Sequence, residues 1–131
     1  MFKFERGSFF GGQLDYSIVD LHFSMNVYNG LHYMKCFEFD ITEEEMSEIE
    51  KIVKPAQEWK KKYNNDSFLD GYGWNIEYCH NDVQMHAQGY MDYPDDFRIV
   101  VSGLQDYMEC LCKKYCSDIY IEEEAERRRS L

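Results

Sequence analysis

The side chains best suited to chemistry lie close together in the sequence, around one predicted β-hairpin: Asp70, Glu77, Cys79, His80 and His86. A carboxylate that orients an imidazole is half of many catalytic sites. The turn chemistry of the hairpin predicts that Glu77 faces His86 across the two strands, on the outward side. No recognisable nucleophile motif or metal-ligand set accompanies this pair in the sequence. We therefore interpret the pair as a surface ion pair, with a hydrolase-like site at this hairpin as the alternative.

The five cysteines and four histidines form no recognisable metal-binding motif. Cys112 and Cys116 lie close enough in sequence to share a helix face, but a structural zinc site normally needs four ligands. No two histidines have the spacing of an HExxH motif. The odd number of cysteines and the missing signal sequence indicate reduced thiols. The sequence therefore predicts no bound metal, no cofactor and no disulfide.

Carboxylates are the most abundant charged groups of the chain. There are 25 Asp and Glu residues against 14 Lys and Arg, so the formal net charge is −11 and the mean field repels nucleic acid and anionic membranes. Eleven tyrosines add side chains that are common in protein interfaces. Two groups of acids are best placed to form a binding face, namely Glu38, Asp40, Glu43, Glu44 and Glu48, and Asp92, Asp95 and Asp96. These features predict a surface for a basic protein partner.

Two-residue alternation of apolar and polar side chains predicts the central hairpin. The Asn81-Asp82 pair tolerates the positive φ angles that a tight turn requires. With this pair at the centre of the turn, Tyr78 pairs with Met85 and Ile76 pairs with Ala87. All four apolar side chains then share one face, which we expect to be buried.

The segment before the first helix predicts further strands. Alternation indicates a short strand over residues 2–6. Within residues 13–28 the apolar positions change phase near Val19-Asp20, so either two strands form a hairpin or one long strand bends through a bulge, and the pattern leaves both open. Asn29-Gly30 is the strongest hairpin signal in the chain, and it introduces a strand over residues 31–39.

Two helices are predicted from apolar stripes at three- and four-residue spacing. The first begins with a capping box at Thr42, and its stripe continues to Tyr63, with Pro55 expected to kink or divide it. The second begins near Asp95, and its stripe reaches Tyr115. Pro94 cannot continue a central strand, so it separates this helix from the hairpin.

Four segments of the chain occur in an order that resembles an uncharacterised family of small α+β proteins common in Firmicutes. They are the Gly-Ser-Phe-Phe-Gly-Gly turn at Gly7–Gly12, the Tyr-Asn-Gly turn at Tyr28–Gly30, the Asp-Gly-Tyr-x-Trp strand start at Asp70–Trp74 and the Gly-Tyr-Met-x-Tyr-Pro strand end at Gly89–Pro94. The resemblance covers roughly residues 4–115. It implies an α+β fold and carries no assigned activity.

These patterns predict one α+β domain over residues 1–116, followed by a polar C-terminal extension over residues 117–131. The domain is expected to contain an antiparallel sheet of four or five strands with the two main helices packed on one face. In the extension, Ile119 and Ile121 allow a terminal strand, and the charges of residues 122–129 allow a solvated helix. The N-terminus lacks the apolar stretch of a signal peptide, which predicts a cytoplasmic protein.

For function, the sequence favours a small acidic protein-binding module over an enzyme. One form of this hypothesis is an inhibitor, such as an immunity or anti-defence protein, that occupies a basic, nucleic-acid-binding surface of its partner. The other non-enzymatic interpretation is a structural or regulatory homodimer, formed through an aromatic sheet face around Tyr33, Phe37 and Phe39. Neither interpretation involves a membrane or direct contact with nucleic acid.

Overall fold

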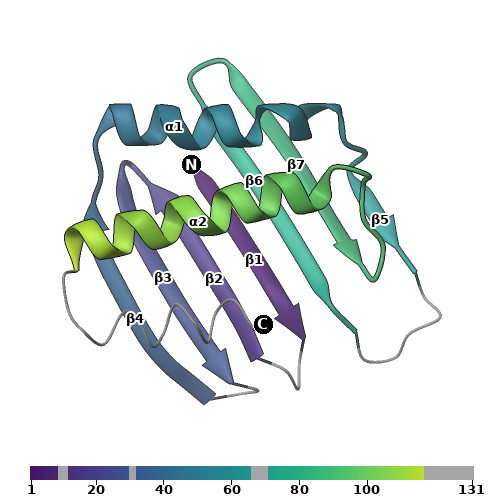
Figure 1. Cartoon of the computed structure of the whole chain (residues 1–131), viewed down its shortest axis with the longest axis horizontal. Coiled ribbons are helices and arrows are strands. Elements are labelled where there is room, and N and C mark those ends of the chain that lie inside the picture. Colours follow the sequence, from purple (N-terminus) through teal and green to yellow (C-terminus); the bar gives the residue numbers. More distant parts are fainter. Residues whose placement is uncertain (9–11, 30–31, 66–70, 117–131) are drawn as a thin grey trace.

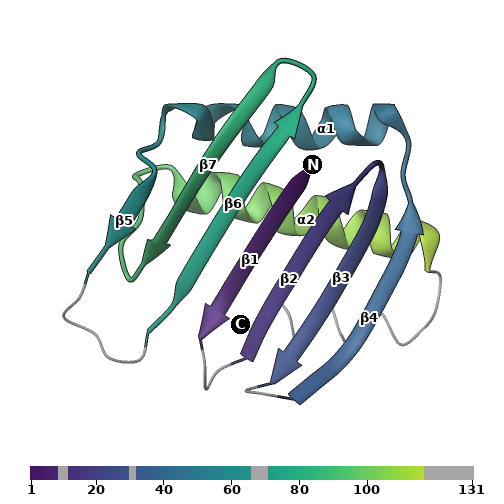
Figure 2. The same cartoon turned by 180° about the vertical axis from the view of Figure 1, so that it is seen from behind.

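The computed structural model describes residues 1–8, 12–29, 32–65 and 71–116. These residues form one seven-stranded sheet with the order β4-β3-β2-β1-β6-β7-β5 (Figures 1 and 2). Its strands are β1 (Phe2–Ser8), β2 (Gly12–Val19), β3 (His22–Asn29), β4 (His32–Asp40), β5 (Lys62–Asn64), β6 (Gly73–His80) and β7 (Val83–Tyr90). The helices are α1 (Glu43–Val53), the 3-10 helix η1 (Lys54–Glu58) and α2 (Phe97–Tyr115). None of the helices in these ranges is long and apolar enough to cross a membrane.

The sheet is larger than the sequence pattern predicts, and it is mixed. The predicted antiparallel sheet of four or five strands is therefore wrong, although the fold class is α+β. The N-terminal strand β1 lies in the middle and pairs antiparallel with both β2 and β6. The pairs β2-β3, β3-β4 and β6-β7 are antiparallel too, whereas β5 runs parallel to β7. The extra strands come from two places where the sequence pattern was ambiguous or misleading.

The first place is the turn between β2 and β3. Asp20 and Leu21 both have positive φ angles, 50° and 62°. Such angles at both central residues are characteristic of the type I′ turn, the commonest two-residue hairpin connection. The change of apolar phase thus marks a hairpin and not a bulged strand. Ile18 pairs with Phe23 across it, and both side chains are buried.

The second place is the segment after α1. The predicted helix through Tyr63 is wrong, because α1 ends at Val53 and η1, with Pro55 in its first turn, replaces it. Proline has no N–H to donate and restricts the backbone around it, so the α-helical ladder does not continue. The chain becomes extended at Trp59, and β5 then joins the edge of β7. The ring centroids of Trp59 and Tyr63 each lie 5.8 Å from that of Trp74.

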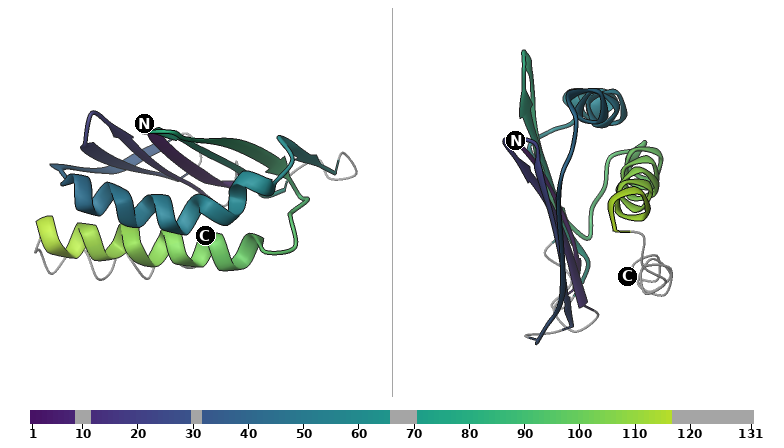
Figure 3. Two further views of the ribbon diagram at one scale, coloured as in Figure 1. Left: turned by 90° about the horizontal axis from the view of Figure 1, so that it is seen from above. Right: turned by 90° about the vertical axis from the view of Figure 1, so that its left-hand side faces the viewer.

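Both helices lie on one face of the sheet (Figure 3). The central hairpin has the predicted register, with Tyr78 opposite Met85 and Ile76 opposite Ala87. Ile76, Tyr78 and Ala87 are buried in the core, whereas Met85 is only half-buried. We call the face of the sheet that points away from the helices the open face. Its described side chains are mainly polar, because each strand alternates between the two faces.

The aromatic face considered for a homodimer lies on the helix side of β4. Phe39 stacks between Phe23 and Tyr115, with ring centroids 4.3 Å and 4.7 Å away. The end of α2 thus covers Phe39, and Phe37 is half-buried. The Tyr33 side chain, the glycine turn at residues 9–11 and the predicted extension at residues 117–131 lie outside the described part of the structure.

Candidate functional site

An open pocket with aromatic walls lies where β7 leads into α2. Its volume is about 500 Å³. It is lined by Tyr72, Tyr93, Pro94, Asp95, Phe97 and Arg98, and we call it the aromatic pocket. The Tyr93 ring lies 6.0 Å from Tyr72 and 4.9 Å from Phe97. Pockets of this size with aromatic walls and a few polar groups are typical binding sites.

Two tryptophans support this pocket from inside the protein. Trp74 is 3% exposed, and its indole N–H donates to the backbone oxygen of Asp92 at 3.0 Å. The indole N–H of Trp59 donates to Asp96 Oδ1 at 2.7 Å. Phe97 packs between the two indoles, 4.9 Å from Trp74 and 6.1 Å from Trp59. These contacts hold the connection between β7 and α2 on its core-facing side, while its outer side stays accessible.

The two tyrosines of the pocket are neutral at physiological pH. Burial raises the pKa of Tyr72, and the nearby Arg6 guanidinium only partly opposes this shift. Burial also raises the pKa of Tyr93, and the Asp92 carboxylate raises it further. Both phenols consequently keep their O–H groups and can donate hydrogen bonds to a ligand.

The predicted acids Asp92, Asp95 and Asp96 all lie beside the aromatic pocket, but they have different roles. Asp92 and Asp95 are exposed, and Asp95 lines the pocket directly. Asp96 is the N-cap residue of α2, yet its carboxylate binds the Trp59 indole and makes no side-chain hydrogen bond to the helix. Asp96 is thus mainly structural, and Asp92 and Asp95 are available to a partner.

The other predicted acids lie at the junction of β4 and α1, toward the opposite end of the long axis (Figure 1). All five are exposed: Glu38, Asp40, Glu43, Glu44 and Glu48. The structure therefore separates the two predicted groups and does not join them into one acidic surface. Two of the junction acids pair with basic side chains. His80 Nε2 lies 2.9 Å from Glu43 Oε2, and Lys51 donates to Glu48 at 2.9 Å.

His22 lies beside this junction, and we predict that it titrates above the ordinary histidine value. Its Nδ1 is 2.9 Å from Asp40 Oδ1, and its Nε2 is 3.3 Å from Glu38 Oε1. The hydrogen bond with Asp40, and then that with Glu38, raises the pKa of His22 above 6.5. Protonated His22, bonded to the two carboxylates, should stabilise the fold below the unfolded-state pKa of His22. This contribution is lost as the pH rises through its folded-state pKa.

An NMR titration of the His22 ring measures this pKa directly. Asp40→Asn should lower it, because the strongest charged partner is removed. Glu44→Gln changes a nearby exposed acid without a contact to His22 and serves as the control. A wild-type value at or below 6.5 would contradict the arrangement.

The predicted pair of Glu77 and His86 forms on the open face. His86 Nε2 lies 3.3 Å from Glu77 Oε1 and 2.8 Å from Asn75 Oδ1. Cys79 also lines the adjacent groove, but its Sγ accepts a hydrogen bond from Gln84 at 3.4 Å. These contacts form no pair of nucleophile and base, so they add nothing to the hydrolase-like alternative.

The aromatic pocket was not predicted from the sequence. Tyr72 and Tyr93 entered only through the strand-start and strand-end segments, although the density of aromatic residues around the second helix start was a signal for the pocket. In the described ranges, no three His, Cys, Asp or Glu side chains are grouped so that they could hold a metal ion. A scan of the chain against protein-family models gave no match, and a search of the curated proteins found no similar sequence. The resemblance to a Firmicutes family stays a prediction.

Proposed function

We propose that this protein is a small acidic protein-binding module that docks on a basic surface of a partner. An inhibitor, immunity or anti-defence protein that blocks a nucleic-acid-binding surface works in this way. The observation that carries the proposal is the aromatic pocket with Asp92 and Asp95 at its edge. It combines aromatic anchors with exposed surface charge, which is how many protein interfaces are built.

Exposed apolar side chains support this location. Among the described residues, the large hydrophobic side chains that are clearly exposed are Val19 at 52%, Tyr93 at 40% and Ile99 at 77%. Tyr93 forms a wall of the pocket, and Ile99 lies in the first turn of α2 next to Arg98. Two of these three residues therefore lie at the same connection. An exposed apolar group surrounded by polar side chains typically marks an interaction surface.

The charge of the site favours a basic partner. A lysine or arginine of the partner can lay its aliphatic stem along the outer side of Tyr93 while its charged end reaches Asp95. Arg98 also lines the pocket, so the site is not uniformly negative. We expect the partner to place a neutral or acidic group opposite Arg98. The separate acids of the β4-α1 junction would act mainly by steering the encounter.

Affinity capture with the full chain, followed by binding measurements on the captured protein, tests the proposal. Tyr93→Ala should weaken binding about 30-fold, or about 2 kcal/mol, because it removes an aromatic anchor. Asp92→Lys with Asp95→Lys should mainly slow association and reduce the salt dependence. The Glu43, Glu44 and Glu48 to lysine triple variant reports on the junction acids in the same assay.

Matched controls keep this test specific. Val19→Ala truncates an exposed apolar side chain elsewhere, and Asp82→Lys with Asp106→Lys makes the same charge change at other exposed positions. Both control variants should bind the partner like the wild type, because they leave Tyr93 and its neighbouring acids in place. An acidic partner, or a partner whose binding ignores Tyr93→Ala and both acid reversals, would show that the proposal is wrong. A measurable reaction abolished by His86→Ala would favour the hydrolase-like alternative.

A further inference from the structure

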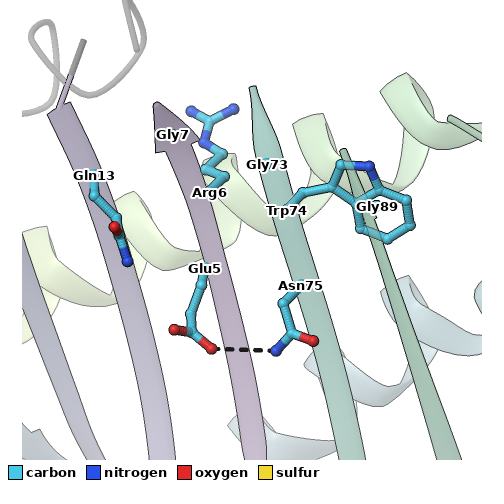
Figure 4. Close-up of a pocket in the computed structure, with 8 residues that line it drawn as sticks. All are labelled: Glu5, Arg6, Gly7, Gln13, Gly73, Trp74, Asn75 and Gly89. Atoms are coloured by element: carbon cyan, nitrogen blue, oxygen red, sulfur yellow. Dashed lines mark hydrogen bonds between the residues drawn. The ribbon is translucent and has the colours of Figure 1, made fainter. Parts of the chain in front are cut away.

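The open face contains a second pocket that the proposed protein-binding surface does not use. It extends across β2, β1 and β6 to β7 and has a volume of about 290 Å³. It is lined by Glu5, Arg6, Gly7, Gln13, Gly73, Trp74, Asn75 and Gly89 (Figure 4). We call it the polar furrow. It shares no lining residue with the aromatic pocket.

Two glycines create the space. Gly7 of β1 pairs with Gly73 of β6, so two neighbouring strands lack a side chain at the same level. Gly7 has a φ of 141°, which itself favours glycine. Gly73 has no such constraint, and a Cβ there would meet only the backbone oxygens of Gly89 and Gly7, at 3.8 Å and 3.9 Å. Backbone and packing therefore do not require glycine at position 73, and its effect is to keep the furrow open.

The polar groups beside this space are held in place. Asn75 Nδ2 donates to Glu5 Oε1 at 3.1 Å (Figure 4). Asn75 Oδ1 lies 2.8 Å from His86 Nε2. Gln13 Nε2 donates to Asp15 Oδ1 at 3.0 Å. Carboxamide and carboxylate groups offer fixed donors and acceptors in one plane. Their mutual hydrogen bonds reduce the ordering that a ligand would have to impose.

The lining indicates a ligand rich in hydroxyl groups. Glu5, Gln13 and Asn75 offer one carboxylate and two neutral amides to the furrow, whereas the Arg6 guanidinium turns toward Phe4 and Tyr72. Asp15 lies directly opposite Glu5 on the neighbouring strand, which repels an anion. The register also places Tyr28 opposite Gln13 and Tyr90 opposite Gly73, at the same level as the two glycines. Neither tyrosine lines the furrow itself, but each flanks it by this register, and a tyrosine ring gives a face on which the C–H side of a further sugar can pack.

From this combination we propose that the polar furrow binds a neutral saccharide, with one sugar ring above Gly7 and Gly73 and its hydroxyl groups bonded to Glu5, Gln13 and Asn75. A volume of about 290 Å³ is at the lower end of the range of small-molecule pockets, ~300–1,000 Å³, and suits a single ring of a longer chain. The furrow is open, so the remaining sugars can extend over the polar open face.

NMR titration of the full chain with maltotriose, cellotriose and triacetylchitotriose, each up to about 10 mM, tests this inference at affinities of order 1 mM. At least one of them should shift the backbone amides of Gly7 and Gly73 and the side-chain amide of Asn75. Gly73→Val fills the furrow and Asn75→Ala removes a bonding group, so each should weaken binding at least ~10-fold. Ser17→Val, on the open face but outside the furrow, is the matched control and should bind like the wild type.

Inorganic phosphate and arginine amide serve as charged probes. Neither should shift the furrow amides. The inference is wrong if none of the three saccharides shifts these signals, if the shifts persist in both furrow variants, or if a charged probe binds there in place of the sugars. Circular dichroism of each variant shows whether it is folded, and Asn75→Ala carries the test if Gly73→Val is not.

Discussion

Gly89→Val should lower the free energy of unfolding by about 3 kcal/mol, the upper end of the usual cost of overpacking. Gly89 lies opposite Trp74, whose indole passes directly over it. A Cβ at position 89 would be 2.4 Å from Trp74 Nε1 and 2.5 Å from Cε2. The indole cannot move away cheaply, because it is buried against Phe97 and its N–H is bound to Asp92.

Gly73→Ala is the matched control for this change. It adds a methyl group to the paired strand of the same sheet, but its Cβ would meet nothing closer than 3.8 Å. We expect no loss of stability from it, and a gain of up to about 1 kcal/mol, because alanine restricts the unfolded chain. Urea unfolding of both variants gives the comparison. Equal stability of the two would contradict the placement of Trp74 over Gly89.

Glu45→Ala should have the second large effect, a loss of about 2 kcal/mol. Glu45 is 7% exposed and joins three segments of the chain. Its Oε1 accepts hydrogen bonds from Tyr115 Oη and from the backbone N–H of Thr42, and its Oε2 pairs with Lys114 at 3.0 Å. The substitution therefore removes one of the two hydrogen bonds of the α1 capping box and a link to the end of α2. Glu44→Ala, at the exposed neighbouring position, should change stability by less than about 0.5 kcal/mol.

The contribution of Glu45 should depend on pH in a defined direction. Burial alone raises its pKa, but the hydrogen bonds from Tyr115, Thr42 and Lys114 outweigh burial, and the pKa lies below the ordinary value of 4.5. A carboxylate with a lowered pKa stabilises the fold above its unfolded-state pKa, and this contribution is lost as the pH falls through the folded-state pKa. The gap in stability between wild type and Glu45→Ala should be full at neutral pH and shrink in acid below about pH 4. A stability difference between wild type and Glu45→Ala that does not change with pH would contradict the hydrogen-bond network around Glu45.

The two candidate binding sites have no lining residue in common, although Trp74 of the furrow packs against Phe97 of the aromatic pocket. The aromatic pocket is built by the connection between β7 and α2, whereas the polar furrow is lined by residues of four strands. Tyr93→Ala should therefore leave saccharide binding unchanged, and Gly73→Val should leave capture of a protein partner unchanged. This separation allows either proposal to fail without the other.

Local signals in the sequence were sufficient for several elements. The capping box at Thr42 was predicted and is present, because both of its hydrogen bonds join residues within one helical turn. The central hairpin was predicted with the correct register, and Asn81 has the positive φ of 53° that its turn needs. In both cases the deciding interactions join residues that are close together in the chain, so side-chain type and spacing determine them.

The tertiary structure alone decided the size of the sheet and the location of the aromatic pocket. The segment from Lys62 has the apolar spacing of a helix, and it becomes a parallel edge strand because the edge of β7 supplies hydrogen-bond partners and Trp74 supplies a packing surface. Asp96 has the residue type of a helix cap, yet its carboxylate binds the distant Trp59. Composition and spacing determined an acidic α+β chain with its capping box and hairpin. They could not determine which distant residues meet, because such contacts depend on how the whole sheet and both helices pack together.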